Sequence, residues 1–479
     1  MLDPDSCYRA LKTHDARFDG RFFVGVSSTR IYCRPVCTVK TPRRENCTFY
    51  ASASAAEEAG YRPCLRCRPE LAPGNAPIDA VGRLAQATAS CIEDGLLDEA
   101  GVDELAERLR VSDRHLRRVF HSEFGVSPLR FAQTQRLLLA KRLLADTGLS
   151  VTEVAFASGF SSLRRFNTLF KERYRLRPSQ LRQARGRSFP AGLLTFELAY
   201  RPPLDWEGML SFLAARAIPG VEAVAGRRYQ RTVCVAARGS IHRGWITVAA
   251  VAGKPTLRLD MSASLAKAVP PVLAGIKRLF DLGCDPTDIA SHLGELAATN
   301  PGMRVPGAFD GFEMAVRAIL GQQITVKAAT TLAGRFAAAL GDPIETPHAS
   351  LTRVFPAAAT VARARVGDLA ALGIVRTRAE AVRNLARAVS DGSLRLDPGA
   401  DVEPTLEKLM AIPGIGPWTA QYLAMRALGW PDAFPDGDAG VMKALRTKSA
   451  KRALEISARW RPWRAYAVMH LWRSLEVGT

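Results

Sequence analysis

Long apolar segments are missing from this chain of 479 residues. No uninterrupted apolar run approaches the roughly 20 residues that a membrane-spanning helix needs. The opening residues, Met1 to Cys7, lack the basic start and apolar stretch of a secretory signal. Repeats of solenoid length and low-complexity tracts are absent as well. We therefore expect a cytoplasmic protein, and the length favours about three or four compact domains.

Acidic residues and cysteines are also scarce. The chain has 46 Asp and Glu against 66 Lys and Arg, which gives a formal net charge of +20. This excess favours a polyanionic partner such as nucleic acid, although charge alone does not separate such a protein from an ordinary basic one. Cysteine is limited to nine residues, an odd number that is typical of a reducing compartment. Five of them are expected to be small buried side chains: Cys7, Cys47, Cys91, Cys234 and Cys284.

The other four cysteines form two short pairs, Cys33-Arg-Pro-Val-Cys37 and Cys64-Leu-Arg-Cys67. Two thiol pairs separated by a loop have the spacing of a tetrahedral zinc site, and a thiol-lined core is the less favoured alternative. Zinc with four thiolates carries a net charge of about −2, so its sulfurs are ionised nucleophiles. Five arginines surround the pairs and are candidate contacts for DNA phosphates: Arg30, Arg34, Arg62, Arg66 and Arg68.

Residues 1–75 resemble the zinc domain of the Ada adaptive-response proteins, through Tyr-Cys-Arg-Pro around Cys33 and Arg-Pro-Cys-x-x-Cys around Cys64. In that family the first cysteine takes the methyl group of a DNA methylphosphotriester. The resemblance implies that Cys33 is this acceptor and that Cys37, Cys64 and Cys67 are the other zinc ligands. Methylation would bring the site to about −1 and tighten DNA binding, so that damage acts as a switch. No residue is evident that could regenerate the acceptor, which implies one turnover per protein.

Residues 78–187 predict two helix-turn-helix units joined by a long helix over about 129–146. Ser112 is the expected N-cap of one second helix, and Ser161 or Ser162 that of the other. Segments rich in turn formers predict linkers on either side, at 71–77 and 185–192.

This helical region resembles the AraC-type DNA-binding domains, through Ala155-Phe-Ala-Ser-Gly-Phe160 and Phe170-Lys-x-x-Tyr174. The resemblance implies promoter DNA as a partner, with both second helices in the major groove. It also makes RNA polymerase a candidate partner, and the expected state is a monomer. An ordinary helical bundle with solvated arginines is the alternative. The candidate DNA contacts are Arg114, Arg117, Arg118, Arg164 and Arg165.

A glycine-rich hairpin is predicted at Ile412-Pro-Gly-Ile-Gly416, between two helices. Gly414 and Gly416 would let the backbone approach a DNA phosphate closely, and a monovalent cation often assists such a grip. A tight helix–helix turn is the alternative. With the acidic loop Ala433-Phe-Pro-Asp-Gly-Asp-Ala-Gly440, the pattern resembles the helix-hairpin-helix DNA glycosylases. Members that also cleave the DNA backbone have lysine where this chain has Trp418, so the resemblance implies a monofunctional glycosylase.

Residues 191–479 resemble the AlkA-type 3-methyladenine DNA glycosylases, through the runs that begin at Pro203, Phe312 and Trp460. The resemblance implies an α+β domain with a TBP-like curved antiparallel sheet over 191–300 and an all-α glycosylase domain over 301–479. Together with a small α+β zinc domain and an all-α helix-turn-helix domain, the expected fold class is multidomain. The Pro-Cys-His-Arg motif of the Ada methyltransferase domain is absent, so direct reversal of O6-methylguanine is not expected.

The expected chemistry is release of an alkylated base that has been flipped out of the duplex. A cationic base is already a good leaving group, so one carboxylate suffices to stabilise the oxocarbenium-like sugar and direct a water. Motif matching makes that carboxylate Asp438, with Asp436 as the competitor. An aromatic cage suits an electron-poor purine, and its expected members, with core packing as their alternative role, are Trp418, Tyr422 and Trp472.

Gln323 stands where some relatives insert an apolar wedge into the space left by the flipped base. Because Gln323 is polar, a stacking wedge is doubtful, and Gln322 or Gln323 is expected to hydrogen-bond the orphaned partner base. The alternative for the whole chain is a transcriptional regulator whose C-terminal half binds damaged DNA without efficient catalysis.

Overall fold

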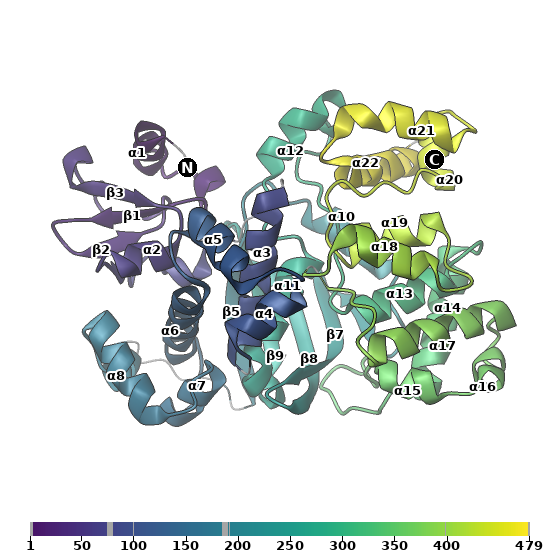
Figure 1. Ribbon diagram of the computed structural model, residues 1–479, viewed down its shortest axis with the longest axis horizontal. Coiled ribbons are helices and arrows are strands. Elements are labelled where there is room, and N and C mark those ends of the chain that lie inside the picture. Colours follow the sequence, from purple (N-terminus) through teal and green to yellow (C-terminus); the bar gives the residue numbers. More distant parts are fainter. Residues whose placement is uncertain are drawn as a thin grey trace.

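The computed structural model describes residues 3–73, 80–98, 100–183, 190, 192–397 and 399–477. The N-terminal module lies beside the helical regulator region, and the C-terminal half packs against both (Figure 1). The predicted linkers 71–77 and 185–192, with the domain boundaries at 75, 78, 187 and 191, fall mainly outside the described residues. No helix in the described part of the chain combines the length and apolar character needed to cross a membrane.

The N-terminal module is a four-stranded sheet in the order β3-β1-β2-β4 with two helices. Its antiparallel pairs join β1 (Phe23–Val26) to β2 (Ile31–Cys33) and to β3 (Cys47–Tyr50). The short β4 (Arg62–Pro63) runs parallel to β2, with Tyr32 opposite Pro63. This register brings the end of β2 beside Cys64, which follows β4. The helices are α1 (Pro4–Lys12) and α2 (Ala53–Glu58).

The regulator region is entirely helical. Ser112 caps the second helix of the first unit through the His115 N–H, and Ser162 caps that of the second unit through the Arg165 N–H. Ser162 is therefore the cap, not Ser161, and a long helix joins the two units as predicted. The helices are α3 (Ala80–Glu93), α4 (Val102–Arg108), α5 (Asp113–Phe124), α6 (Pro128–Asp146), α7 (Val151–Ala157), α8 (Leu163–Tyr174) and α9 (Pro178–Gln183).

The third region is an antiparallel sheet in the order β5-β9-β8-β7-β6. Alternate residues of the central strands, such as Leu257, Leu259 and Met261, are fully buried, as expected for a sheet with one covered face. The strands are β5 (Leu193–Ala199), β6 (Glu222–Ala225), β7 (Arg228–Ala237), β8 (Ser240–Ala250) and β9 (Thr256–Ser262). The helices are α10 (Trp206–Ala214), α11 (Val269–Leu279) and α12 (Pro286–Leu293).

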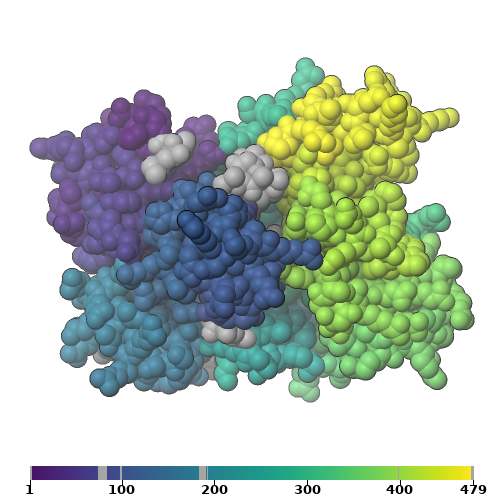
Figure 2. Space-filling model, viewed as in Figure 1, coloured from purple at the N-terminus to yellow at the C-terminus, as the bar shows by residue number. Residues whose placement is uncertain are grey.

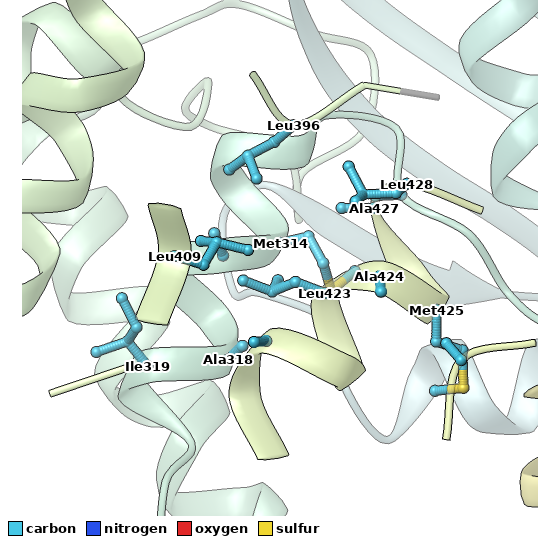
Figure 3. Close-up of a cluster of buried hydrophobic side chains, with 14 of the residues drawn as sticks. Met314, Ala318, Ile319, Leu396, Leu409, Leu423, Ala424, Met425, Ala427 and Leu428 are labelled. Carbon is cyan, nitrogen blue, oxygen red and sulfur yellow. The ribbon is translucent and has the colours of Figure 1, made fainter. Parts of the chain in front are cut away.

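The C-terminal region is a helical body around one large core. Figure 3 shows part of that core, where Met314 and Ala318 of α13 lie near Leu409 of α18 and Leu423 of α19. Its helices are α13 (Gly311–Leu320), α14 (Val326–Leu340), α15 (Ala358–Arg363), α16 (Val366–Ala370), α17 (Arg376–Ser390), α18 (Val402–Met410), α19 (Pro417–Arg426), α20 (Ala439–Ala444), α21 (Ala450–Ser457) and α22 (Arg464–Val477).

The four regions pack against one another through apolar contacts and ion pairs, and are not merely joined by linkers. One hydrophobic cluster runs from Phe166 and Phe170 of α8 into the sheet, where it includes Phe196 of β5. Ion pairs add to it, among them Arg278 of α11 with Asp94. The space-filling view shows the regulator helices seated against the C-terminal half (Figure 2). The turn-rich segments predict linkers between these regions, whereas no local pattern in the sequence predicts the shared core.

Candidate functional sites

The four predicted zinc ligands lie together at one end of the N-terminal sheet. The Sγ atoms of Cys33, Cys37, Cys64 and Cys67 all lie within 4.8 Å of one another. In a tetrahedral zinc site with Zn–S bonds of about 2.3 Å, the sulfurs are about 3.8 Å apart, so the four thiols fit this ion. The pairing of β2 with β4 explains the cluster, because it sets Cys33 beside Cys64.

The four sulfurs differ in their surroundings. The backbone N–H of Arg34 donates to Cys67 Sγ and that of Arg66 to Cys64 Sγ, each at 3.4 Å. Among the described residues no backbone N–H is found donating to Cys33 Sγ. Cys33 is 6% exposed and Cys37 1%. Since a hydrogen bond draws charge from a thiolate, Cys33 keeps more of its nucleophilic character than Cys64 or Cys67.

Arg34 does not have the surface position that a phosphate contact requires. Its side chain is buried, pairs with Asp19 at 2.8 Å, and donates to the Cys67 carbonyl at 3.1 Å. An internal carboxylate thus pairs with its charge in this structure, and a contact between Arg34 and DNA stays a prediction. Arg68 is similarly paired with Asp146. Arg30 and Arg66 are exposed and Arg62 is half-buried, which keeps them as candidates.

The zinc module is joined to the regulator helices through a buried carboxylate that sequence analysis missed. Glu57 of α2 accepts hydrogen bonds from the Tyr32 hydroxyl at 3.1 Å and the Thr134 hydroxyl of α6 at 3.4 Å. The guanidinium of Arg173 in α8 lies 3.7 Å away. Burial raises the pKa of Glu57 to about 7, although Arg173 acts to lower it. Tyr32 directly precedes Cys33, so Glu57 links that strand to both α6 and α8.

The arginines predicted to read DNA lie on the outer faces of α5 and α8. Arg114, Arg118, Arg164 and Arg165 are exposed. Arg117 differs, because its guanidinium donates to the Asp113 carboxylate at 2.8 Å, one helical turn earlier. The two helices thus present basic residues to solvent, as a major-groove reader requires.

The predicted aromatic cage and its carboxylate converge in the helical body. Trp418 Nε1 donates to Asp438 Oδ2 and Trp472 Nε1 donates to Asp438 Oδ1, both at 2.9 Å. The backbone N–H of Val441 also donates to Oδ1, at 2.8 Å, because Asp438 is the N-cap of α20. Asp438 is therefore fixed by both indoles and a helix terminus. The competing carboxylate, Asp436, receives only the Gly437 N–H among the described residues.

The rings of the cage are close enough to form one surface. Trp418 and Tyr422 stack at a centroid distance of 5.3 Å and an interplanar angle of 12°, and Trp472 lies 6.4 Å from Tyr422. The buried Arg426 donates to the Tyr422 hydroxyl at 2.7 Å, and burial lowers the pKa of this guanidinium to about 10.

A cavity of about 130 Å³ adjoins Trp472 of the cage, and residues of the sheet domain form part of its wall. Phe212 of α10 and three methionines contribute to its wall, together with Trp472. Phe212 is not among the residues predicted from the sequence. It lies within the run that begins at Pro203, one of those that carry the resemblance to AlkA-type glycosylases, and this resemblance could have identified it. The methionines are Met209, Met303 and Met469.

The predicted hairpin lies between α18 and α19. Gly414 has a φ of 92°, which favours glycine, and a Cβ added there would lie 3.1 Å from Ala381. A Cβ at Gly416 would meet nothing within 4 Å, so the backbone is open to a ligand there. Gln322 donates through Nε2 to the Gly414 carbonyl at 2.9 Å and to Thr419 Oγ1 at 3.0 Å. Gln323 is exposed, with a φ of 56°. Within the described part of the chain, the Gln322 amide is held by the hairpin, whereas no hydrogen bond is found at the Gln323 amide.

Family models match the chain in four consecutive segments. They are described as the metal binding domain of Ada (residues 6–70), a helix-turn-helix domain (105–184), the AlkA N-terminal domain (195–310), and the HhH-GPD superfamily of base excision DNA repair proteins (316–455). These segments and the structure confirm the multidomain fold class.

Relatives match either the whole chain or its second half. A probable bifunctional transcriptional activator/DNA repair enzyme AlkA of Mycobacterium tuberculosis is 39% identical over 99% of this chain and 97% of its own length. DNA-3-methyladenine glycosylase 2 of Escherichia coli is 38% identical over 58% of this chain and 96% of its own. A solved 3-methyladenine DNA-glycosylase from Archaeoglobus fulgidus shares the fold with a TM-score of 0.50, at 21% identity, over 58% of this chain and 97% of that one.

Proposed function

The chain belongs to the family of bifunctional transcriptional activator/DNA repair enzymes of the AlkA kind, and we propose that it senses and repairs alkylated DNA. Its N-terminal module takes methyl groups from DNA methylphosphotriesters, its regulator helices bind promoter DNA, and its second half releases alkylated bases such as 3-methyladenine. The domains follow the limits 1–75, 78–187, 191–300 and 301–479.

Methyl transfer takes place at Cys33. Bound by Cys33, Cys37, Cys64 and Cys67, zinc would keep the four sulfurs ionised at neutral pH. The Cys33 sulfur attacks the methyl carbon, an S–C bond forms, and the methyl C–O bond breaks with its electron pair on oxygen. The phosphotriester becomes an ordinary phosphodiester anion, and the thiolate becomes a thioether. Cys33 suits this role because, among the described residues, it lacks the backbone donors that reach Cys64 and Cys67.

Base release takes place at Asp438. The flipped base stacks in the cage of Trp418, Tyr422 and Trp472, where aromatic faces attract its positive charge. The N-glycosidic bond breaks with its electrons on the base, which leaves neutral. The Asp438 carboxylate stabilises the oxocarbenium-like sugar, orients the water that adds to it and accepts the proton that this water loses, giving an abasic site. Trp418 stands where a lyase has its lysine, so the backbone is not cleaved.

One observation carries the assignment of this second activity: both indoles of the cage donate to the two oxygens of Asp438. The substitution Asp438→Asn keeps the size of the side chain and removes its charge. Released base is measured from alkylated duplex DNA with each protein. We expect release by the wild type and a loss of at least about 100-fold in the variant, the size typical of an electrostatic catalytic group. A wild type that binds damaged DNA but releases no base would support the alternative of a regulator with an inactive glycosylase fold.

Both chemistries can be followed together in duplex DNA that carries labelled methyl groups. Label recovered in free bases and also fixed on Cys33 supports both activities in one chain. Label found only on the protein would contradict the glycosylase activity. Label found only in free bases would contradict methyl transfer to Cys33 and leave the zinc module with a binding role. A Cys33→Ser variant should lose only the protein-bound label.

The proposed function implies partners of two kinds, DNA and protein. Alkylated DNA and promoter DNA are the two nucleic-acid partners, and RNA polymerase is the protein partner that an activator needs. The chain acts as a monomer in the cytoplasm. A monovalent cation supports the hairpin around Gly414 and Gly416 when DNA is bound.

A further inference from the structure

Gln322 has an unusual place in the helical body, because it lies between the buried core and the DNA-gripping hairpin. It follows α13 by two residues, and α13 packs in the core with the two hairpin helices (Figure 3). Its Nε2 donates both to the Gly414 carbonyl, at 2.9 Å, and to Thr419 Oγ1, at 3.0 Å. One amide group thus reaches the hairpin itself and the first turn of α19.

Ile415 of the hairpin is buried in the core, but the hairpin has few other polar restraints. Among the described residues, Gln322 supplies the only side-chain hydrogen bond to the backbone of 412–416. Inside the hairpin, the Ile415 N–H donates to the Ile412 carbonyl at 3.0 Å. Gly414 is a glycine at positive φ, and α19 starts at Gly416 without a side-chain cap. A segment of this kind loses much conformational freedom when it must hold one shape for a phosphate.

We propose that Gln322 is a positioning residue that holds the hairpin and the start of α19 in their DNA-binding arrangement. This inference rests on the proposed function, since it assumes that the hairpin grips DNA. Gln322 acts through Gly414, whose carbonyl it fixes, and through Thr419, the neighbour of Trp418 in the cage. Gln323, exposed and at positive φ, is the residue left to enter the duplex.

The test compares Gln322→Met and Gln322→Glu with the wild type in the full chain. Methionine keeps the length of the side chain without its donors, and glutamate turns an acceptor towards the Gly414 carbonyl. Base release from a duplex with one 7-methylguanine is followed under single-turnover conditions. Because two hydrogen bonds are lost, we expect the half-saturating DNA concentration to rise about 30-fold for Met, the equivalent of about 2 kcal/mol, and further for Glu. The plateau rate should stay within about threefold, because Asp438 and its donors are untouched.

Two further variants separate positioning from simple stability. Thr419→Val removes one of the two acceptors and should shift the half-saturating concentration in the same direction, but less. Thr232→Val removes a buried hydrogen bond to the Arg353 carbonyl, 2.7 Å long, on strand β7. This control should lower the melting temperature and leave the half-saturating concentration unchanged. If Gln322→Met behaves like Thr232→Val, the proposal is overturned.

The base opposite the lesion gives an independent readout. A residue that holds the hairpin weakens binding equally with thymine or cytosine opposite, whereas one that reads the orphaned base changes their ranking. A changed ranking would overturn the proposal. Fluorescence anisotropy with the same duplexes reports affinity without catalysis. If the wild type releases no base, the proposed glycosylase fails, and the anisotropy series still decides the role of Gln322.

Discussion

In the proposed glycosylase site Asp438 supplies the negative charge, and the indoles of Trp418 and Trp472 hold its carboxylate in place. Each indole donates to a different carboxylate oxygen, so the rings that receive the base also fix the group that acts on it. The motif predicts Asp438 as the catalytic carboxylate, but its two indole donors could not be predicted, because Trp472 lies on a helix 34 residues away in sequence.

Trp472→Phe should separate these two roles of the ring. Phenylalanine keeps an aromatic face for the base but loses the N–H to Asp438, whose Oδ1 then depends on Val441 alone. We expect the single-turnover rate of base release to fall about tenfold, the effect of about 1.4 kcal/mol, with little change in the half-saturating DNA concentration. As a control, Trp460→Phe alters a core tryptophan outside the cage. An unchanged rate in Trp472→Phe would contradict a part for this N–H in catalysis.

Glu57 should make the stability of the zinc module depend on pH. Its folded-state pKa is raised from 4.5 to about 7 by burial. Between these values the folded protein holds a proton that the unfolded chain has released, so Glu57 stabilises at low pH and this contribution is lost as pH rises from about 4.5 to 7. A shift of this size corresponds to about 3 kcal/mol. Glu57→Gln cannot ionise, and its melting temperature should fall less than that of the wild type between pH 5 and pH 8. Parallel pH profiles for the two proteins would disprove this role.

Among the elements, those with a strong local signal could be predicted from sequence. The helix predicted over about 129–146 is α6, Pro128–Asp146, because Ser127 caps it and Pro128 suits its first turn. The hairpin was predicted from two glycines in five residues. The choice between Ser161 and Ser162 stayed open, since either serine can cap a helix and only the backbone geometry decides.

Contacts between elements could not be predicted from local sequence patterns. Arg34 illustrates the reason: its neighbours are basic and metal-binding in sequence, yet in the fold its nearest charge is Asp19, 15 residues earlier. Gln322 is similar, because its partners at 414 and 419 are 92 and 97 residues away. Local patterns therefore found the residues of each site, and tertiary pairing decided which of them are free to meet DNA.

For the whole molecule, the shared core predicts that the halves are not independent. Phe196 of β5 belongs to the cluster that includes Phe166 and Phe170, and the Arg142 guanidinium lies 5.0 Å from its ring. A fragment of residues 192–479 would expose this apolar surface. We expect its melting temperature to lie about 5 °C or more below that of the same unit in the full chain, for a loss of about 2 kcal/mol. Scanning calorimetry of both proteins checks this, and equal melting temperatures would mean that the contact adds no stability.

That shared core also determines how long the methylated protein persists in a cell after DNA damage. Under the proposed function, a molecule whose Cys33 has accepted a methyl group is spent as a detector, but its base pocket is unaltered and remains attached. The methylated population would then be a lasting record of past exposure that still removes damaged bases. Because neither part can be discarded without the other, only growth of the cell or degradation of the entire polypeptide would erase that record.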